Sequence, residues 1–203
     1  MAGSRSVANG AAHEGEHDDE AAALSMDRLD VIAPGAFAAA VAPLFEGARG
    51  FLGRLAMARP FGSVDALFVQ AHEIAHAMPP DEQLELIDAH PRLGAPPGGV
   101  SALSFVEQGY DRDDAARAAE AAETEGARVA AELDRLNAAY EARFGFRYCV
   151  FVAGRSRAEL LPGMTAALEA DRDAEVSRAL DAVIDIARDR YATLTGVSRE
   201  DRG

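Results

Sequence analysis

Two histidines four residues apart, His72 and His76, form the most recognisable metal-binding pattern in the sequence. Side chains with this spacing share one face of a helix, where both imidazoles can ligate one Zn²⁺ ion. Glu73 completes an H-E-x-x-H pattern, in which the glutamate serves as general base on a metal-bound water. The pattern is short, it needs a third ligand, and two prolines after Met78 should end the helix. We interpret the match as a coincidence, and a zinc metallohydrolase is the alternative.

A second candidate for chemistry is His90, in the sequence IDAHPRLG. This histidine is expected to close a helix, because Pro91 favours an extended residue before it and Gly94 permits a tight turn. The negative end of the helix dipole tends to raise the pKa of such a histidine toward neutrality, which suits a general acid or base. A histidine that only caps the helix is the alternative.

Polar side chains that could contact a substrate follow in SFVEQ, residues 104–108. Glu107 lies three residues after Ser104, the spacing of a helix capping box, so a purely structural role is one interpretation. The other interpretation is that Glu107 and the adjacent Gln108 face His90 across the intervening loop.

Four arginines, with no acidic residue among them, lie between residues 143 and 158. The chain has 20 basic and 34 acidic residues and a formal net charge of −14, so this segment is a local attractor for anions. Solvated arginines that flank a buried run are the alternative. The four are Arg143, Arg147, Arg155 and Arg157.

The composition excludes several classes of chemistry and of partner. All 20 basic residues are arginine, which excludes a lysine Schiff base, a pyridoxal phosphate aldimine and a P-loop lysine. The net charge disfavours nucleic acid and anionic membranes as partners. The single cysteine excludes an intrachain disulfide and Cys-rich metal centres. No apolar run reaches the roughly 18 residues of a membrane span, and the N-terminus lacks the apolar region of a signal peptide, so we expect a cytoplasmic protein.

The pattern of apolar residues predicts that helices position these side chains. Residues 1–25 are small, polar and acidic, and we expect them to be a disordered tail. Residues 26–198 show helical spacing nearly throughout, which predicts an all-α, single-domain bundle of about seven to nine helices. Gly126 is a point at which the longest helix could be interrupted. The expected helices lie near 35–46, 50–58, 63–78, 80–89, 112–142, 156–169 and 172–195.

One segment departs from the helical pattern, FGFRYCVFVAG at 144–154. It is rich in aromatic and β-branched residues and contains a glycine near each end, so it should be extended. Because no second convincing strand exists, we expect a buried extended connector whose backbone groups bond to helix ends and side chains. Cys149, inside this run, should be a small buried apolar residue.

Taken in order, several stretches resemble the 2-oxo-4-hydroxy-4-carboxy-5-ureidoimidazoline (OHCU) decarboxylases of uric acid degradation. The resemblance covers nearly everything after residue 30 and rests on the motifs HPxLG, SxxEQ and LNxxYxxxFGF. It implies an all-α fold, a homodimer, and cofactor-independent conversion of a small-molecule substrate to (S)-allantoin and carbon dioxide. The matching segments are LFEGARGFLGRLAMARPF (44–61), LIDAHPRLG (86–94), SFVEQ (104–108), LNAAYEARFGFRY (136–148) and DAEVSRALDAVIDIARDRY (173–191).

By position, the resemblance implies catalytic roles for two residues. His90 matches the catalytic histidine of the family and would be the acid–base group, while Glu107 would orient the substrate or tune His90. No metal or other cofactor is expected. The residues implied to contact the substrate are Pro91, Ser104, Phe105, Val106, Gln108, Ala153, Gly154, Arg155, Ser156 and Arg157.

Three departures from the family pattern concern the substrate. Phe51 stands near the position of the usual tryptophan, and the residues after Gln108 differ from the usual continuation. Ala153 stands where some members carry an arginine, for which Arg155 or Arg157 would have to substitute. A helical interaction module without catalytic activity is therefore a second alternative.

Overall fold

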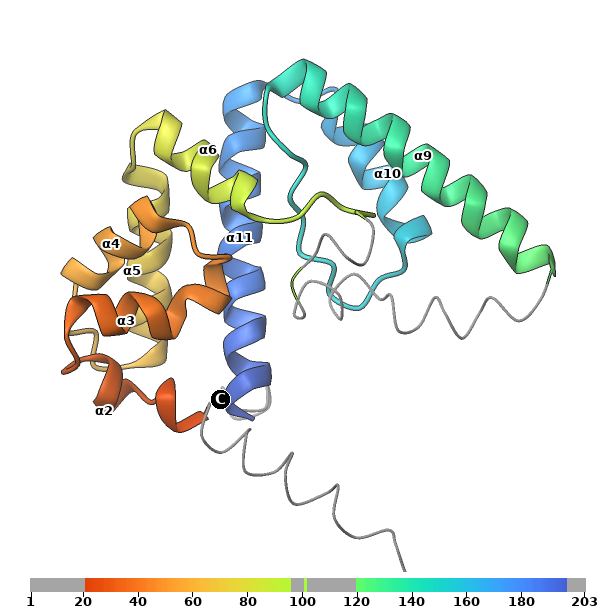
Figure 1. Cartoon of the computed structure of the whole chain (residues 1–203). Coiled ribbons are helices and arrows are strands. Elements are labelled where there is room, and N and C mark those ends of the chain that lie inside the picture. The colour runs from red at the N-terminus through yellow and green to blue at the C-terminus, as the bar shows by residue number, and fades with distance from the viewer. Residues whose placement is uncertain (1–20, 96–100, 102–119, 197–203) are drawn as a thin grey trace, which may run out of the picture.

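The computed structural model describes residues 21–95, 101 and 120–196, and this part of the chain is all-α, without a strand (Figure 1). The prediction of an all-α bundle with seven to nine helices is thereby confirmed. None of the described helices is both long and apolar enough to cross a membrane. The elements are α2 (Met26–Leu29), α3 (Pro34–Val41), the 3₁₀ helix η1 (Ala42–Phe45), α4 (Arg49–Met57), α5 (Val64–Ala77), α6 (Pro80–Ala89), α9 (Glu120–Phe144), α10 (Arg157–Ala167) and α11 (Arg172–Thr195).

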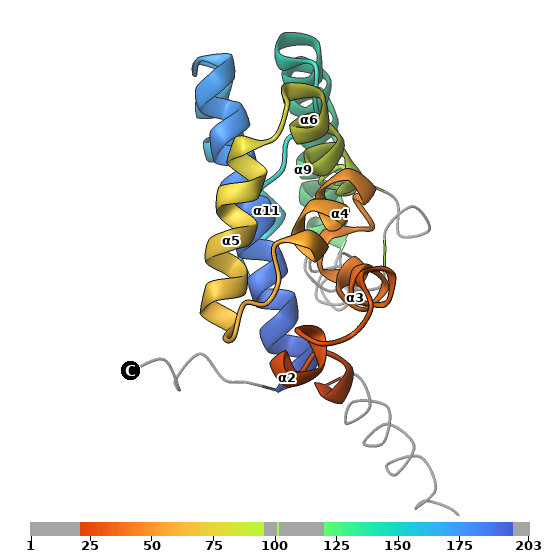
Figure 2. The same ribbon diagram turned by 90° about the vertical axis from the view of Figure 1, so that its left-hand side faces the viewer.

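Helix α11 is the central element of the fold. Figures 1 and 2 show α2 to α6 on one side of it and the pair α9 and α10 on the other. It packs directly against α5, α6 and η1, while α9 packs against α10. Its buried residues recur every three or four positions, which gives the helix the apolar face that this packing requires. They include Ala179, Leu180, Val183, Ile186 and Ala187.

Prolines set the boundary between α5 and α6, as predicted. Helix α5 ends at Ala77, and α6 begins at Pro80 in its first turn, where a missing backbone N–H is tolerated. The predicted interruption at Gly126 is wrong, because α9 continues through it from Glu120 to Phe144. One glycine in a helix costs about 1 kcal/mol relative to alanine, which the other helix-forming residues of α9 offset.

Residues 145–156 connect α9 to α10 without regular structure, and four of their apolar side chains are buried, in agreement with the prediction of a buried connector. Side chains from two helices satisfy the backbone of this connector. Arg178 of α11 donates to the carbonyl oxygen of Cys149 at 2.8 Å, and Asp88 of α6 accepts from the Arg147 amide at 2.8 Å. The buried side chains are Phe146, Tyr148, Cys149 and Val152.

The predicted N-terminal tail falls mostly in residues 1–20, outside the described part of the chain. Leu24 is within the predicted tail, yet it is only 4% exposed and belongs to the core. The Tyr191 hydroxyl of α11 donates to the Leu24 carbonyl oxygen at 3.0 Å. The segment before α2 is therefore packed against the end of α11.

Candidate active site

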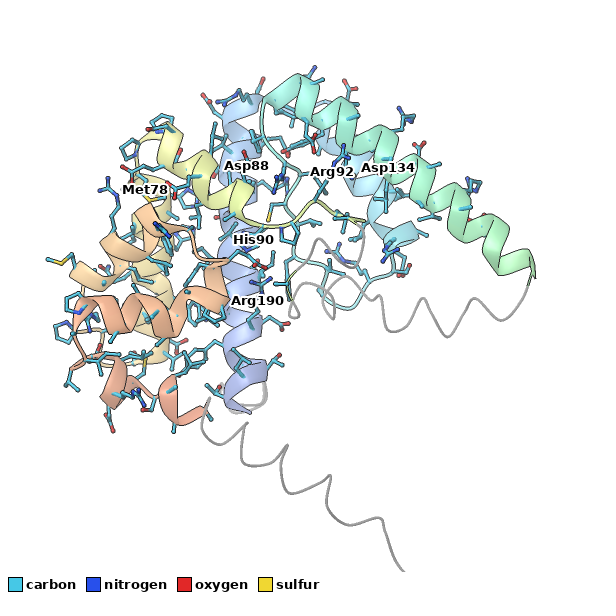
Figure 3. The ribbon with its side chains drawn as sticks, viewed as in Figure 1. Met78, Asp88, His90, Arg92, Asp134 and Arg190 are labelled. Atoms are coloured by element: carbon cyan, nitrogen blue, oxygen red, sulfur yellow. The ribbon has the colours of Figure 1, made fainter. Side chains whose placement is uncertain are left out.

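His90 lies directly after α6, on the segment that runs beside α11 (Figure 3). Its backbone is extended, with φ −72° and ψ 140°, as Pro91 requires of the residue before it. The His90 amide donates to the Ile87 carbonyl oxygen at 3.2 Å and so ends the helix. The side chain is 4% exposed, which means that the turn directs the imidazole into the interior.

The turn after His90 is bound to α9 by the LNxxY motif. The fully buried Asn137 donates from Nδ2 to the Leu93 carbonyl oxygen at 2.9 Å. Gly94 has a φ of +80°, and a Cβ on it would lie 3.3 Å from the Leu133 Cδ1. The positive φ favours glycine here, and the close approach of the Leu133 side chain of α9 leaves little room for a Cβ.

Two arginines hold this turn in place from either side. Arg147 of the connector donates from Nη1 to the carbonyl oxygens of Asp88 and His90, at 2.8 and 3.2 Å. Arg92 donates from Nε to the Glu141 carboxylate of α9 at 2.8 Å. Two segments that carry the family resemblance, 86–94 and 136–148, therefore meet at the His90 turn.

An ion pair between Arg190 and Glu46 acts electrostatically on His90. The Arg190 side chain of α11 is 2% exposed, and its Nη2 donates to Glu46 Oε1 at 2.8 Å. The guanidinium also donates from Nη1 to the Pro43 carbonyl oxygen at 2.9 Å. The Ser101 hydroxyl donates to the same Glu46 oxygen at 2.8 Å. This network joins η1, α11 and the chain beyond the His90 turn.

Glu46, the partner of Arg190, lies in a left-handed turn. Glu46 has a φ of +50° and is followed by Gly47 at +74°. The Glu46 amide donates to the Ala42 carbonyl oxygen, and this hydrogen bond ends η1. The left-handed conformation costs a residue with a side chain about 1–2 kcal/mol, so the surrounding contacts must hold it.

The pKa of His90 is lowered to about 4. Burial is the main cause, because it disfavours the charged imidazolium, and the positive charge of Arg190 lowers the pKa further. The Glu46 carboxylate and the Leu86 carbonyl oxygen act in the opposite direction without offsetting burial. The expected rise of this pKa by the helix dipole is therefore wrong, and His90 is neutral at pH 7.

The two ring nitrogens of His90 differ in their surroundings. Nδ1 lies 3.4 Å from the Leu86 carbonyl oxygen, which can only accept, so Nδ1 carries the proton of the neutral ring. Nε2 is buried and has no hydrogen-bond partner among the described residues. A buried polar atom without a partner costs about 1–3 kcal/mol. With the proton on Nδ1, Nε2 carries the lone pair of the neutral ring and is able to accept a proton.

The lowered pKa makes the stability of the fold depend on pH in a defined direction. The unfolded histidine binds a proton below pH ~6.5, whereas the folded one does so only near pH 4, so stability is lost as the pH falls between these values. From pH 7 to pH 5 this lowers the free energy of unfolding by about 2 kcal/mol. The His90→Gln variant should lose about 2 kcal/mol less over the same interval, measured by urea denaturation. Equal losses in the two proteins would contradict the lowered pKa.

The other residues expected at the site fall into three groups. Pro91 is partly buried beside His90, whereas the segment 153–156 is exposed and Arg157 partly so. Arg155 donates to the carbonyl oxygens of Phe151 and Val152, so it closes its own loop. Ser104, Phe105, Val106, Glu107 and Gln108 lie outside the described residues.

Two residues of the network were missed from the sequence, Arg190 and Glu46. Arg190 lies four residues after Ile186 and seven after Val183, on the apolar face of α11, and a cation in that position indicates a buried partner. Glu46 precedes Gly47 in a turn, which by itself gives no sign of a buried ion pair. The two partners are 144 positions apart in the chain, so no local sequence pattern indicates that they pair.

The H-E-x-x-H histidines lie on α5, and their side chains approach α11. The Nε2 atoms of His72 and His76 are 3.0 and 2.8 Å from the same oxygen, Oδ1 of Asp181. The sequence alone does not identify a third ligand for this pair, and the tertiary structure places a carboxylate 105 residues after His76 beside both rings.

Comparison with known proteins shows which family this chain is similar to. A family model described as OHCU decarboxylase matches residues 31–192. The Bacillus subtilis uric acid degradation bifunctional protein PucL is 31% identical over 171 residues, which cover 84% of this chain. The chain spans 33% of the length of that relative. The Haloferax volcanii 2-oxo-4-hydroxy-4-carboxy-5-ureidoimidazoline decarboxylase is 26% identical over 169 residues, covering 83% of this chain and 95% of the relative.

Two solved structures share the fold. One is an OHCU decarboxylase crystallised in the presence of (S)-allantoin, with a TM-score of 0.58 and 23% identity over 76% of this chain and 96% of that chain. The other is an (S)-allantoin synthase, with a TM-score of 0.58 and 16% identity over 84% of this chain and 54% of that chain. At these identities the likeness concerns the fold alone.

Proposed function

Since the chain belongs to the OHCU decarboxylase family, we propose that it converts 2-oxo-4-hydroxy-4-carboxy-5-ureidoimidazoline to (S)-allantoin and carbon dioxide. The observation that carries the proposal is the buried Nε2 of a neutral His90, which has no partner among the described residues and follows α6 in the HPRLG turn. The relatives named for this reaction and for uric acid degradation support the choice of substrate.

The substrate supplies its own electron sink. One ring carbon carries both the carboxylate and a hydroxyl, and the adjacent carbon forms a C=N bond. When the carbon–carboxylate bond breaks, its electron pair forms a double bond to the adjacent carbon, and the C=N pair moves to nitrogen, which takes up a proton. The hydroxyl then loses its proton to become a carbonyl, and the adjacent carbon gains one. These reaction steps need no lysine, which is consistent with a chain whose basic residues are all arginine.

We propose that His90 transfers the proton in this sequence. Its neutral ring, with Nδ1–H toward the Leu86 carbonyl oxygen, presents the Nε2 lone pair to the substrate hydroxyl. The imidazolium that forms would be short-lived, because burial and Arg190 both disfavour it. It would therefore return its proton readily to the carbon that becomes the stereocentre of allantoin. Arg190 and Glu46 would act as positioning residues that keep the ring neutral and fixed.

Glu107 is proposed to orient the substrate or to tune His90, and the resemblance to the family supports this role. A set of further residues is proposed to contact the ring and its carboxylate on the same ground. They are Pro91, Ser104, Phe105, Val106, Gln108, Ala153, Gly154, Arg155, Ser156 and Arg157.

A homodimer in the cytoplasm is proposed as the setting of the reaction. The family resemblance supports the dimer, and the single cysteine, Cys149, suits a reducing compartment. Size-exclusion chromatography with light scattering would measure the assembly.

Turnover of freshly generated OHCU tests the proposed function. Racemic OHCU produced from urate decays spontaneously, and the purified protein is expected to accelerate carbon dioxide release and to produce (S)-allantoin in excess, measured by circular dichroism. Heat-denatured protein is the control. A rate equal to the spontaneous one would favour the non-catalytic interaction module, and activity that disappears with a chelator and returns with zinc would favour the metallohydrolase.

A further inference from the structure

His72 and His76 of α5 and Asp181 of α11 form a cluster that the proposed decarboxylation does not use. The two histidine rings lie one helical turn apart, with centroids separated by 4.2 Å. Both Nε2 atoms approach the same Asp181 oxygen, and the three potential ligand atoms all lie within 4.8 Å of one another. We propose that this cluster binds a divalent transition metal ion of the Zn²⁺ class and joins α5 to α11.

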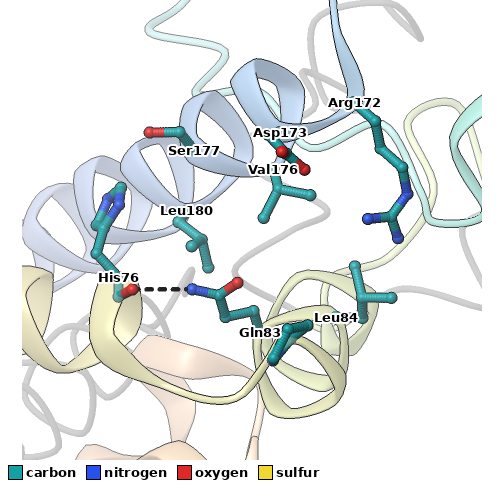
Figure 4. Close-up of a pocket in the computed structure, with 9 residues that line it drawn as sticks. His76, Gln83, Leu84, Arg172, Asp173, Val176, Ser177 and Leu180 are labelled. Carbon is teal, nitrogen blue, oxygen red and sulfur yellow. Dashed lines mark hydrogen bonds between the residues drawn. The ribbon is translucent and has the colours of Figure 1, made fainter.

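The helices that carry the three ligands are held firmly together. Phe68 of α5 contacts Tyr191 of α11 edge to face at 5.9 Å, and the Arg188 guanidinium of α11 lies 5.0 Å from the Phe68 ring centre. Gln83 donates from Nε2 to the His76 carbonyl oxygen at 3.0 Å, which fixes the last turn of α5. Figure 4 shows the His76 ring directed from α5 toward α11. The ligands are therefore presented by a preformed backbone.

The distances between the ligand atoms are close to those of a metal site. In a tetrahedral zinc site with bonds of ~2.0–2.2 Å, neighbouring ligand atoms are about 3.3 Å apart. The two histidine–aspartate separations, 3.0 and 2.8 Å, need to increase by only a few tenths of an ångström, and the third pair of ligand atoms lies within 4.8 Å. The His72 and Asp181 side chains are 51% and 52% exposed, so they can move this far without disturbing the core. Binding would require each Nε2 to present its lone pair, with the proton of each ring on Nδ1.

The ligand types and the surrounding charge select the kind of ion. Two imidazoles and one carboxylate suit Zn²⁺, Cu²⁺, Ni²⁺ or Co²⁺, whereas Ca²⁺ and Mg²⁺ prefer oxygen ligands throughout. Glu73 and Asp185 line the same surface hollow as Asp181, with Arg188 as the cation among them. Three carboxylates against one guanidinium favour a cation in this hollow. A water molecule would complete the coordination.

The cluster lies away from the proposed catalytic site. Asp181 and Arg190 are nine residues apart on α11, which places them about 180° around the helix and roughly 13 Å along its axis. Asp181 is exposed on that outer face, whereas Arg190 is buried beside His90. The metal ion therefore acts as a clip between two helices, and decarboxylation proceeds without it.

Zinc titration of the chelator-treated full chain tests the clip, with calorimetry for stoichiometry and thermal melting for stability. Because His13 and His17 in the N-terminal region could bind zinc separately, all proteins carry His13→Ala and His17→Ala. The expected result is one ion per chain and a melting temperature raised by about 5–10 °C at a zinc concentration one hundred times Kd.

Two matched variants locate the ion. Asp181→Asn should weaken zinc binding at least about tenfold, because it removes the anionic ligand, and at the same zinc concentration it should reduce the rise in melting temperature by about half or more. Asp185→Asn, one turn away in the same hollow, removes the same charge. This variant should keep the zinc affinity and the rise in melting temperature of the parent. Replacement by Co²⁺ should give the visible absorption of a four-coordinate site in the parent and not in Asp181→Asn.

The outcomes distinguish this proposal from the proposed function. Binding that is equal in the parent and in Asp181→Asn, or zinc that leaves the melting temperature unchanged, would overturn the clip without touching the decarboxylase assignment. Decarboxylase activity is expected to be the same with chelator and with zinc. A loss of that activity on chelation would overturn the placement of the ion outside the catalytic site.

Discussion

Replacement of His90 with asparagine is expected to lower the rate of OHCU decarboxylation by about 10²–10⁴-fold, the usual contribution of a general acid or base. Asparagine fills much of the space of the imidazole and can donate to the Leu86 carbonyl oxygen, but it cannot accept a proton at the position of Nε2. The rate loss should appear in kcat more than in KM, because His90 stabilises the transition state of proton transfer and not the bound substrate.

The control for this variant is a second variant, in which two histidines outside the catalytic site are replaced. The double variant His72→Ala, His76→Ala changes side chains on the outer face of α5 and should retain nearly wild-type decarboxylase activity in metal-free buffer. The circular dichroism spectrum and melting temperature of each variant would show that it is folded. Wild-type turnover by a folded His90→Asn protein would remove His90 from the mechanism.

Replacement of Arg190 with methionine is expected to lower the free energy of unfolding by about 3–5 kcal/mol, the effect of removing one partner of a buried ion pair. The variant takes the guanidinium from the Glu46 carboxylate, whose side chain is only 14% exposed, and takes a donor from the Pro43 carbonyl oxygen. The same change removes a positive charge near His90, so the pKa of His90 should rise toward its ordinary value. Urea denaturation measures the first effect and NMR titration of the imidazole measures the second.

Arg188→Met is the matched control, because it removes an arginine two residues earlier on the same helix. Arg188 contacts the Phe68 ring and pairs at 3.3 Å with Asp65, whose side chain is 74% exposed, so the loss of both contacts should cost about 1–2 kcal/mol. In the double variant Glu46→Gln, Arg190→Met, part of the stability should return, since the buried carboxylate is then neutral. Equal destabilisation by Arg190→Met and Arg188→Met would show that the buried pair does not stabilise the fold.

Much of the architecture follows from local properties of the sequence. The period of the apolar residues and the placement of proline predicted the helices, and the boundary between α5 and α6 falls at Pro79 and Pro80 as expected. The extended connector followed from its aromatic and β-branched composition. The helix end at His90 also followed, because a proline restricts the residue before it regardless of what surrounds them. Backbone preferences of this kind depend on neighbours in the chain and can be predicted from them.

The chemical state of the site was decided only by the tertiary structure. The helix dipole, a local feature, predicted a raised pKa for His90, whereas burial and Arg190 lower it to about 4. Burial depends on every element packed around the ring, and Arg190 lies a hundred positions along the chain. The same holds for the pairing of Glu46 with Arg190 and for the meeting of Asp181 with His72 and His76. Electrostatic energy depends on distance and on the loss of water, and both are properties of the packed chain that the order of residues does not display.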